Sequence, residues 1–141
     1  MAKMIFVNLP VSDLARSTAF YQAIGAEKNP QFSDDTGSCM VFSETIYVML
    51  LTHDKYRQFT SKQIADARTT SQVLICLSAN SRDAVDDMVA KAQGAGGGAD
   101  PGPKQDYGFM YGRSFEDPDG HHWEVMWMDA AAVAQSATAA A

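Results

Sequence analysis

The feature that most constrains the fold is an internal duplication, because the same order of elements occurs twice at an offset of roughly 70 residues. The first copy begins with a β-favouring run at 3–9, and a helical pattern then begins after Ser12 and ends at Gly25. The second copy begins with a strand at 72–78, and Ser81 is the expected N-cap of its helix. Further strands are predicted at 26–32, 38–43, 45–51, 110–115 and 121–128, and a loop rich in Gly and Pro at 95–103.

A β-α-β-β-β unit used twice predicts an α+β fold. The two tandem modules, at about 3–52 and 70–129, are expected to form a cupped, mostly antiparallel sheet with the helices on its outer face. A chain of 141 residues is long enough for one domain with a real core, which we expect at 1–129. A polar stretch at 52–70 connects the modules, and the Ala-rich tail at 130–141 is expected to be disordered or a frayed helix.

Composition excludes several classes of partner. Eleven basic residues against seventeen acidic ones give a net charge of −6, and the Lys and Arg residues are scattered singly, so we expect neither a nucleic acid nor an anionic membrane as partner. No stretch reaches transmembrane length or forms a signal peptide. Cys39 and Cys76 lack CxxC spacing and are expected to be free thiols in a reducing compartment. These observations predict a soluble cytoplasmic protein.

Two motifs carry a family resemblance. The first is the run NLPVSDL at 8–14, followed in the helix by FY at 20–21 and IG at 24–25. The second is the hairpin sequence DPDGHHWE at 117–124. In this order and separation they resemble the vicinal oxygen chelate superfamily, which includes glyoxalase I, bleomycin-resistance proteins, fosfomycin-resistance proteins and extradiol dioxygenases. The resemblance covers the chain from about residue 4 to residue 128.

The resemblance implies a homodimer and, in the enzymes of the family, one divalent metal held by side chains from four strands, which polarises vicinal oxygens of the substrate. The matching positions here are Phe6, Met49, Gln72 and Glu124. Phe6 has no donor atom, the Met49 thioether prefers soft metals, and the Gln72 amide is a poor ligand. Only Glu124 fits, so we expect the usual metal site to be largely missing and no cofactor to be bound.

One alternative metal site stays open. His122 and His53 are both expected on the cavity side, and either could join Glu124 in holding a divalent metal. Against this, His53 stands at a strand end, where an exposed histidine is the ordinary outcome.

Strand alternation predicts which side chains line the cavity. Trp123, Val125 and Trp127 share the face of the last strand that should pack on the helices, so Glu124 should face the cavity. The expected ligand-binding residues are Phe6, Asn8, Tyr47, Met49, Gln72, Cys76, His122 and Met126. Arg113 is added as a candidate for holding a carboxylate or phosphate.

An aromatic, thioether-rich cavity with a few polar groups is suited to a small, partly apolar organic ligand, so we expect a small-molecule-binding protein. Glu124 could act as a catalytic general base or anchor a ligand, or it could be a buried acid paired with a neighbour such as His122, Arg113 or Asn8. An enzyme, either metal-dependent and lactoylglutathione-lyase-like or dioxygenase-like, or based on Glu124, is the alternative. A third reading is a protein whose role is association with another protein.

Overall fold

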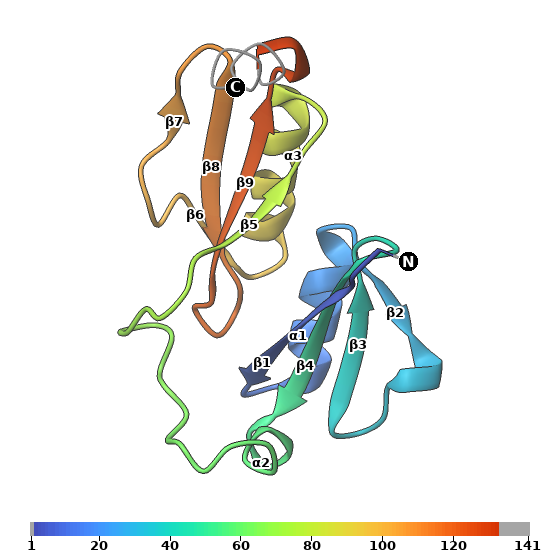
Figure 1. Ribbon diagram of the computed structural model, residues 1–141. Coiled ribbons are helices and arrows are strands. Elements are labelled where there is room, and N and C mark those ends of the chain that lie inside the picture. The colour runs from blue at the N-terminus through green and yellow to red at the C-terminus, as the bar shows by residue number, and fades with distance from the viewer. Residues whose placement is uncertain (1, 133–141) are drawn as a thin grey trace. The chain divides into compact units, whose positions relative to one another are not determined.

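The computed structural model describes residues 2–132. The chain divides into two compact units, Met1–Thr70 and Ser71–Ala141, and each is described by itself. The elements of the first unit are β1 (Ile5–Val11), α1 (Leu14–Ala23), β2 (Glu27–Asn29), a 3₁₀ turn (Pro30–Phe32), β3 (Gly37–Val41), β4 (Ile46–Thr52) and α2 (His53–Tyr56). Its sheet has the order β1-β4-β3-β2, in which β1 and β4 are parallel and the other pairs antiparallel (Figure 1).

The second unit repeats this plan. Its elements are β5 (Ile75–Ser78), α3 (Arg82–Gly94), β6 (Gly98–Ala99), β7 (Gln105–Asp106), β8 (Met110–Glu116) and β9 (His122–Met128). The sheet order is β5-β9-β8-β6, β5 and β9 are parallel, and β7 also pairs with β8. The order β5-β9-β8 matches β1-β4-β3, which confirms the duplicated, mostly antiparallel α+β fold.

Each unit buries one face of its sheet against a helix. In the first unit, α1 packs on β3 and β4, and alternate residues of the strands point toward it. The buried residues of this core include Leu9, Val11, Phe20, Tyr21, Val48 and Leu50. In the second unit, α3 packs on β8 and β9. The buried residues there include Leu77, Val85, Val89, Phe115, Trp123 and Val125. The opposite face of each sheet does not pack on these helices.

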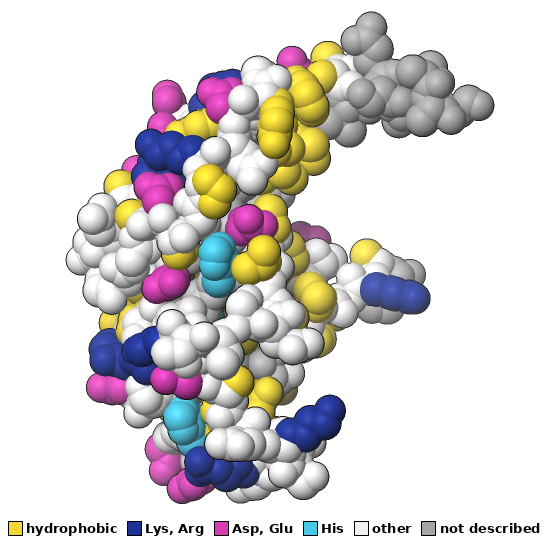
Figure 2. Space-filling view, turned by 90° about the vertical axis from the view of Figure 1, so that its left-hand side faces the viewer, with side chains coloured by type: hydrophobic (Ala, Val, Ile, Leu, Met, Phe, Trp, Pro, Cys, Tyr) yellow, Lys and Arg dark blue, Asp and Glu magenta, His cyan; other side chains and the backbone are white. Residues whose placement is uncertain are grey.

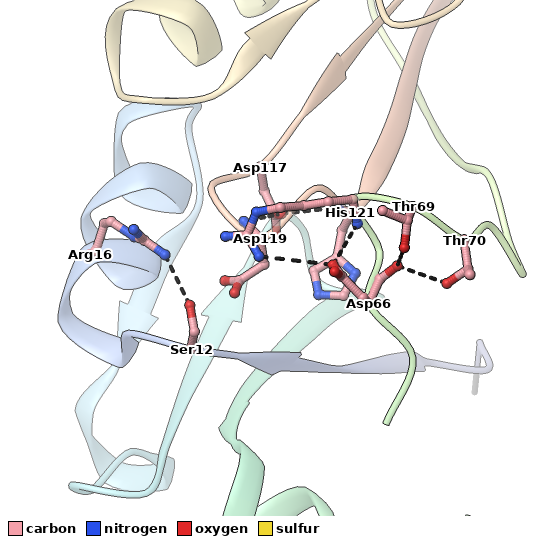
Figure 3. A network of polar contacts seen from close by, with 9 residues as sticks. Ser12, Arg16, Asp66, Thr69, Thr70, Asp117, Asp119 and His121 are labelled. Atoms are coloured by element: carbon pink, nitrogen blue, oxygen red, sulfur yellow. Dashed lines mark hydrogen bonds and ion pairs between the residues drawn. The ribbon is translucent and has the colours of Figure 1, made fainter. Parts of the chain in front are cut away.

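The predicted helix caps are found in the structure, except at the start of α1. The Ser81 side chain accepts a hydrogen bond from the Ala84 amide at 3.0 Å, as an N-cap should. Gly25 follows α1 with a φ of +112°, a conformation that favours glycine. Ser12 is not the N-cap of α1. Asp13 accepts from the Arg16 amide at 3.0 Å, and the Ser12 hydroxyl accepts instead from the Arg16 guanidinium at 3.0 Å (Figure 3).

The predicted strands 38–43, 45–51, 110–115 and 121–128 are shifted by one or two residues at their ends, and the predicted strand 26–32 is shortened to β2 because a 3₁₀ turn begins at Pro30. Three further differences concern β1, β5 and the segment 95–103. β1 continues through Pro10 because β1 is at the end of its sheet, where the missing amide hydrogen interrupts no ladder. β5 begins at Ile75 and not at Gln72, since Trp123 is the first residue of β9 that pairs with it. The segment 95–103 is not wholly a loop, because Gly98 and Ala99 pair with β8.

The predicted tail at 130–141 lies mostly outside the described residues. Within residues 2–132, no helix is both long and apolar enough to cross a membrane.

Candidate functional site

In the first unit, four of the predicted ligand-binding residues lie together on the sheet face opposite α1. Phe6 is beside Tyr47 on the parallel neighbour, and their rings stack with centroids 4.7 Å apart and an interplanar angle of 15°. Asn8 is beside Met49, and its side-chain amide donates to the Phe6 carbonyl at 3.4 Å. Phe6 is 51% exposed, so the stacked pair presents an apolar surface to solvent.

In the second unit, the corresponding face holds a pocket of about 190 Å³. Cys76, Glu124 and Met126 of β5 and β9, all three predicted as site residues, line it. The remaining lining residues are Pro103, Gln105, Met110, Gly112, Arg113 and Val125. The pocket therefore combines three sulfur-bearing side chains with one carboxylate.

The strand register fixes the surroundings of Glu124. Its partners across the sheet are Cys76 on β5 and Ser114 on β8, which gives a row of three residues on one face. Within the described residues, the Glu124 carboxylate accepts no hydrogen bond and forms no ion pair. Among the described residues of the second unit, no hydrogen bond or ion pair joins Glu124 to Arg113 or His122, two of its predicted partners. The Glu124 carboxylate is therefore available to bind a ligand.

Cys76 is a protonated thiol at neutral pH. Cys76 is exposed by surface area, but the protein atoms around it partly desolvate the thiol, which raises the pKa of Cys76, and the negative charge of the neighbouring Glu124 raises this pKa further. Its thiol lies 3.8 Å from the carbonyl oxygen of Leu77, to which it donates. The thiol therefore contributes polarizable, weakly polar surface to the pocket and is a poor nucleophile.

Arg113 lines the pocket, but its guanidinium does not face Glu124. Its partner on β9 is Val125, a residue of the core face, so the side chain points to the side of α3. The guanidinium donates to Asp100 at 3.0 and 2.6 Å and to Asp86 at 3.0 Å. These carboxylates raise the pKa of Arg113. These ion pairs use three of the five N–H donors of Arg113, and its role in holding an anionic ligand stays a prediction.

The three remaining candidate residues, Gln72, His122 and His53, lie in different parts of the fold. Gln72 lies ahead of β5 and is exposed, and the residue of β5 beside Glu124 is Cys76. His122 lies on the Glu124 face of β9, and its Nε2 is buried without a hydrogen-bond partner in the described part of the chain. His53 begins α2 in the first unit.

The donor chemistry does not fit the divalent metal of the family. Asn8 and Met49 in the first unit, and Cys76 and Glu124 in the second, offer an amide, a thioether, a thiol and a single carboxylate. Phe6, the position expected from the resemblance, lies beside Tyr47 and not beside Met49. Among residues 2–132, no three His, Cys, Asp or Glu side chains form a group that could hold a metal ion.

A tight turn between β8 and β9 sets the register that places Glu124. The Asp117 carboxylate accepts from the backbone amides of Asp119 at 3.0 Å and His121 at 2.9 Å (Figure 3). Gly120 has a φ of +91°, which favours glycine at this corner. The DPDG sequence therefore acts structurally by aligning β9 with β8 and β5.

Sequence reasoning missed five pocket residues, one of which, Val125, was assigned to the face that packs on the helices. Met110 and Gly112 share the Glu124 face of the sheet through their β9 partners Met128 and Met126, so strand pairing, once known, would have identified them. Pro103 and Gln105 come from the segment after β6, and no periodic pattern marks that segment. Gly112 leaves open space because it has no side chain.

The surface charges are interspersed. On the face drawn in Figure 2, acidic and basic side chains lie next to one another in small groups and do not gather into one basic patch. Many are paired, including Lys91 with Asp87 at 2.8 Å and Arg82 with Asp106 at 2.7 Å.

Comparison with solved structures gives several close matches in fold. Hypothetical protein SA1046 from S. aureus is 28% identical, with a TM-score of 0.73, and the match covers 90% of this chain and 94% of that one. A glyoxalase/bleomycin resistance protein/dioxygenase family enzyme from Burkholderia phytofirmans is 22% identical, with a TM-score of 0.72 and coverages of 90% and 99%. The fosfomycin resistance protein FosX from Listeria monocytogenes is 21% identical, with a TM-score of 0.64 and coverages of 90% and 91%.

No curated protein matches the chain in sequence. The sequence profile of the Glyoxalase/Bleomycin resistance protein/Dioxygenase superfamily matches residues 3–125, nearly the whole of both modules. The duplicated fold, the DPDG hairpin and this match lead to one conclusion: the chain belongs to the glyoxalase/bleomycin resistance protein/dioxygenase superfamily.

Proposed function

We propose that this protein binds a small, partly apolar organic molecule in the pocket of the second unit, and that the Glu124 carboxylate is its polar anchor. The observation that carries the proposal is the pocket itself, which gathers Cys76, Met110 and Met126 around one carboxylate. Thioethers and a protonated thiol adapt to irregular apolar shapes, and one polar group fixes orientation.

The size of the pocket supports a small ligand. Its volume of about 190 Å³ is below the roughly 300–1,000 Å³ of drug-sized sites. A ligand, or the part of a ligand that enters this pocket, is therefore small.

The state of Glu124 supports a particular ligand chemistry. Its carboxylate has no hydrogen-bond or ion-pair partner among the described residues, and a carboxylate in a partly buried pocket is stabilised by a donor. We expect the ligand to carry an N–H or O–H group or a positive charge at the end that contacts Glu124.

Filling the pocket is the direct test. Gly112 faces Met126 and has no positive φ, and an added Cβ would meet only the Val125 carbonyl oxygen at 3.6 Å. Gly112→Leu should therefore fold and occupy the pocket, whereas Gly94→Leu is the matched control because a Cβ there meets nothing within 4 Å. A thermal-shift screen of small molecules on the wild type, followed by calorimetry, supplies the ligand.

Gly112→Leu should weaken binding by at least about 1.4 kcal/mol, a factor of ten, since the ligand and the leucine compete for one space. Gly94→Leu should bind as the wild type does. Equal affinity in all three proteins, each checked for folding by circular dichroism, would contradict the proposed pocket.

A second candidate function, an enzyme that uses Glu124 as general base, rests on the same unpaired carboxylate. The Glu124→Gln variant distinguishes a ligand anchor from a general base. If Glu124 is an anchor, the substitution lowers affinity. If Glu124 is a base, the variant still binds the ligand but no longer converts it, which mass spectrometry of the recovered ligand would reveal.

A further inference from the structure

We propose that the segment 100–108, which we call the strap, forms one wall of the Glu124 pocket, and that Arg82 and Arg113 are positioning residues that hold the strap in place. This inference rests on the proposed function, because it assigns residues that shape the proposed binding site. Neither arginine needs to touch the ligand.

The first attachment is at the start of the strap. Asp100 receives two hydrogen bonds from the Arg113 guanidinium, at 3.0 and 2.6 Å. The side chains are 15% and 28% exposed for Arg113 and Asp100, so water screens this pair little. Asp100 has a φ of +52°, an unusual conformation for a residue other than glycine, which the bidentate pair helps to maintain.

The second attachment is at the end of the strap. Arg82, at the first position of α3, donates to both oxygens of Asp106 at 3.0 and 2.7 Å and to the Gly108 carbonyl at 3.0 Å. Its guanidinium also lies over the rings of Tyr111 and Trp127, at 5.0 and 5.4 Å from their centroids. One arginine thus joins the strap to the helix and to β8 and β9.

Between these attachments the strap has few other contacts. β7 contributes only two residues to the sheet, and the Gly102 amide donates to the Ser114 hydroxyl at 2.9 Å. Most strap residues are exposed, so hydrophobic burial adds little to hold the segment. The Asp100 amide also donates to the Ser114 carbonyl at 2.8 Å, and the Tyr107 amide donates to the Met110 carbonyl at 2.9 Å. The ion pairs therefore act together with a small number of backbone hydrogen bonds to fix the position of the strap.

The strap brings two residues to the pocket, Pro103 and Gln105. The Gln105 amide oxygen accepts from the Tyr107 hydroxyl at 2.9 Å, which leaves the amide nitrogen as a donor. The pocket therefore contains a donor on the strap and an acceptor at Glu124. A ligand with both an acceptor and a donor group would satisfy the two, so the strap position determines specificity.

The first experiment uses trypsin, because Lys104 lies within the strap and is exposed. Asp106→Asn removes the charge that Arg82 binds but keeps an oxygen acceptor for the Gly108 amide, which donates to Asp106 at 3.0 Å. Asp87→Asn is the matched control, since the same substitution breaks the Lys91 ion pair on the exposed side of α3.

We expect the initial rate of cleavage after Lys104 to rise roughly three- to tenfold in Asp106→Asn, the range for an exposed ion pair with additional contacts, and to stay at the wild-type rate in Asp87→Asn. Circular dichroism would show that all three proteins are folded. Equal cleavage rates in Asp106→Asn and the wild type would overturn the proposal.

The second experiment uses Cys76 as a reporter of access to the pocket. Cys76 lines the pocket and is exposed, whereas Cys39 is buried, and peptide mass spectrometry distinguishes labels on the two. If the strap forms a wall, Asp106→Asn should increase labelling of Cys76 by a bulky maleimide more than labelling by iodoacetamide. If Asp106→Asn accelerates labelling of Cys76 by both reagents equally, or by neither, the strap does not form a wall at this position.

The two experiments need no ligand, so their outcome is separate from that of the ligand screen. If Asp106→Asn opens the strap but filling the pocket with Gly112→Leu changes no binding, the proposed function fails and the strap assignment stands. If ligands bind in the pocket but both strap experiments give wild-type results, the strap assignment fails and the proposed function stands.

Discussion

The chemistry of the pocket depends on two adjacent side chains that lie across a parallel strand pair. Cys76 and Glu124 are Cα partners on β5 and β9, and the carboxylate raises the pKa of the thiol. A negative charge disfavours formation of a thiolate beside it, so Glu124, together with desolvation, keeps the Cys76 thiol protonated.

This coupling predicts the effect of Glu124→Gln on Cys76. The neutral amide removes one of the two causes that raise the thiol pKa, so a larger thiolate fraction should be present at pH 8. The rate of Cys76 alkylation by iodoacetamide should increase. Glu116→Gln, on the neighbouring strand at the partner position of His122, is the control and should leave the rate unchanged. A slower reaction in Glu124→Gln would show that the carboxylate helps to deprotonate the thiol.

At the scale of elements, the turn between β8 and β9 determines where Glu124 lies. Asp117 is only 3% exposed and accepts two backbone hydrogen bonds inside the turn. A similar arrangement occurs in the first unit, where Asp34 accepts from the amides of Thr36 and Gly37 at 2.8 and 3.1 Å, but Asp34 is exposed. The Asp34 carboxylate also accepts from the Thr36 hydroxyl at 2.7 Å, and the two carboxylates differ in burial.

We expect Asp117→Ala to lower the free energy of unfolding by about 1.5–3 kcal/mol, because two amides of a buried turn lose a charged acceptor. Asp34→Ala should cause a smaller loss, since water replaces the carboxylate at an exposed turn. Urea denaturation of both variants gives the comparison. Equal losses would mean that burial does not determine the contribution of these turns.

The strap also has a defined pH dependence. The hydrogen bonds from Arg82 and from the Gly108 amide hold the pKa of Asp106 at about 2, below its ordinary value of 3.8. A lowered folded-state pKa means that the interaction is fully present above about pH 4 and is lost as the pH falls through about 2. Carboxyl NMR of Asp106 should show a midpoint near 2, and Arg82→Gln should move it upward. A wild-type midpoint near 3.8 would contradict the attachment.

At the scale of the whole molecule, charge and donor chemistry limit the partners. The net charge is −6, and basic side chains are dispersed among acidic ones on the face drawn in Figure 2, so we expect no nucleic-acid partner. Each unit has its own buried core, and among residues 2–132 no three His, Cys, Asp or Glu side chains form a group that could hold a metal ion.

From this donor set we expect chelators to have no effect on stability. A protein stabilised by a bound metal loses that contribution when the metal is removed. The melting temperature of protein purified without chelators should therefore be the same with and without EDTA, within the error of a thermal-shift assay. A decrease of several degrees, together with a stoichiometric metal in elemental analysis, would instead support the alternative site of Glu124 with His122 or His53.

Local features were predictable from the sequence because they depend on neighbours along the chain. The N-cap at Ser81 and the glycine at Gly25 follow from capping geometry and from φ, which a few adjacent residues determine. The alternation of Trp123 and Val125 with Glu124 follows from the two-residue period of a strand. The duplication fixed the order of the elements and hence the fold.

Features that depend on a partner strand were decided only by the tertiary structure. Cys76 lies beside Glu124, and Gln72 does not, because pairing with β9 begins at Trp123. Arg113 faces α3 because its partner in the ladder belongs to the core. The strap and its two arginines join residues that lie 13 and 24 positions apart, and no local pattern encodes such contacts. The sequence by itself determined the elements and the faces of β4 and β9. Strand register and long-range ion pairs determined which side chains meet in the pocket, because a shift of one residue in strand pairing changes every cross-strand neighbour.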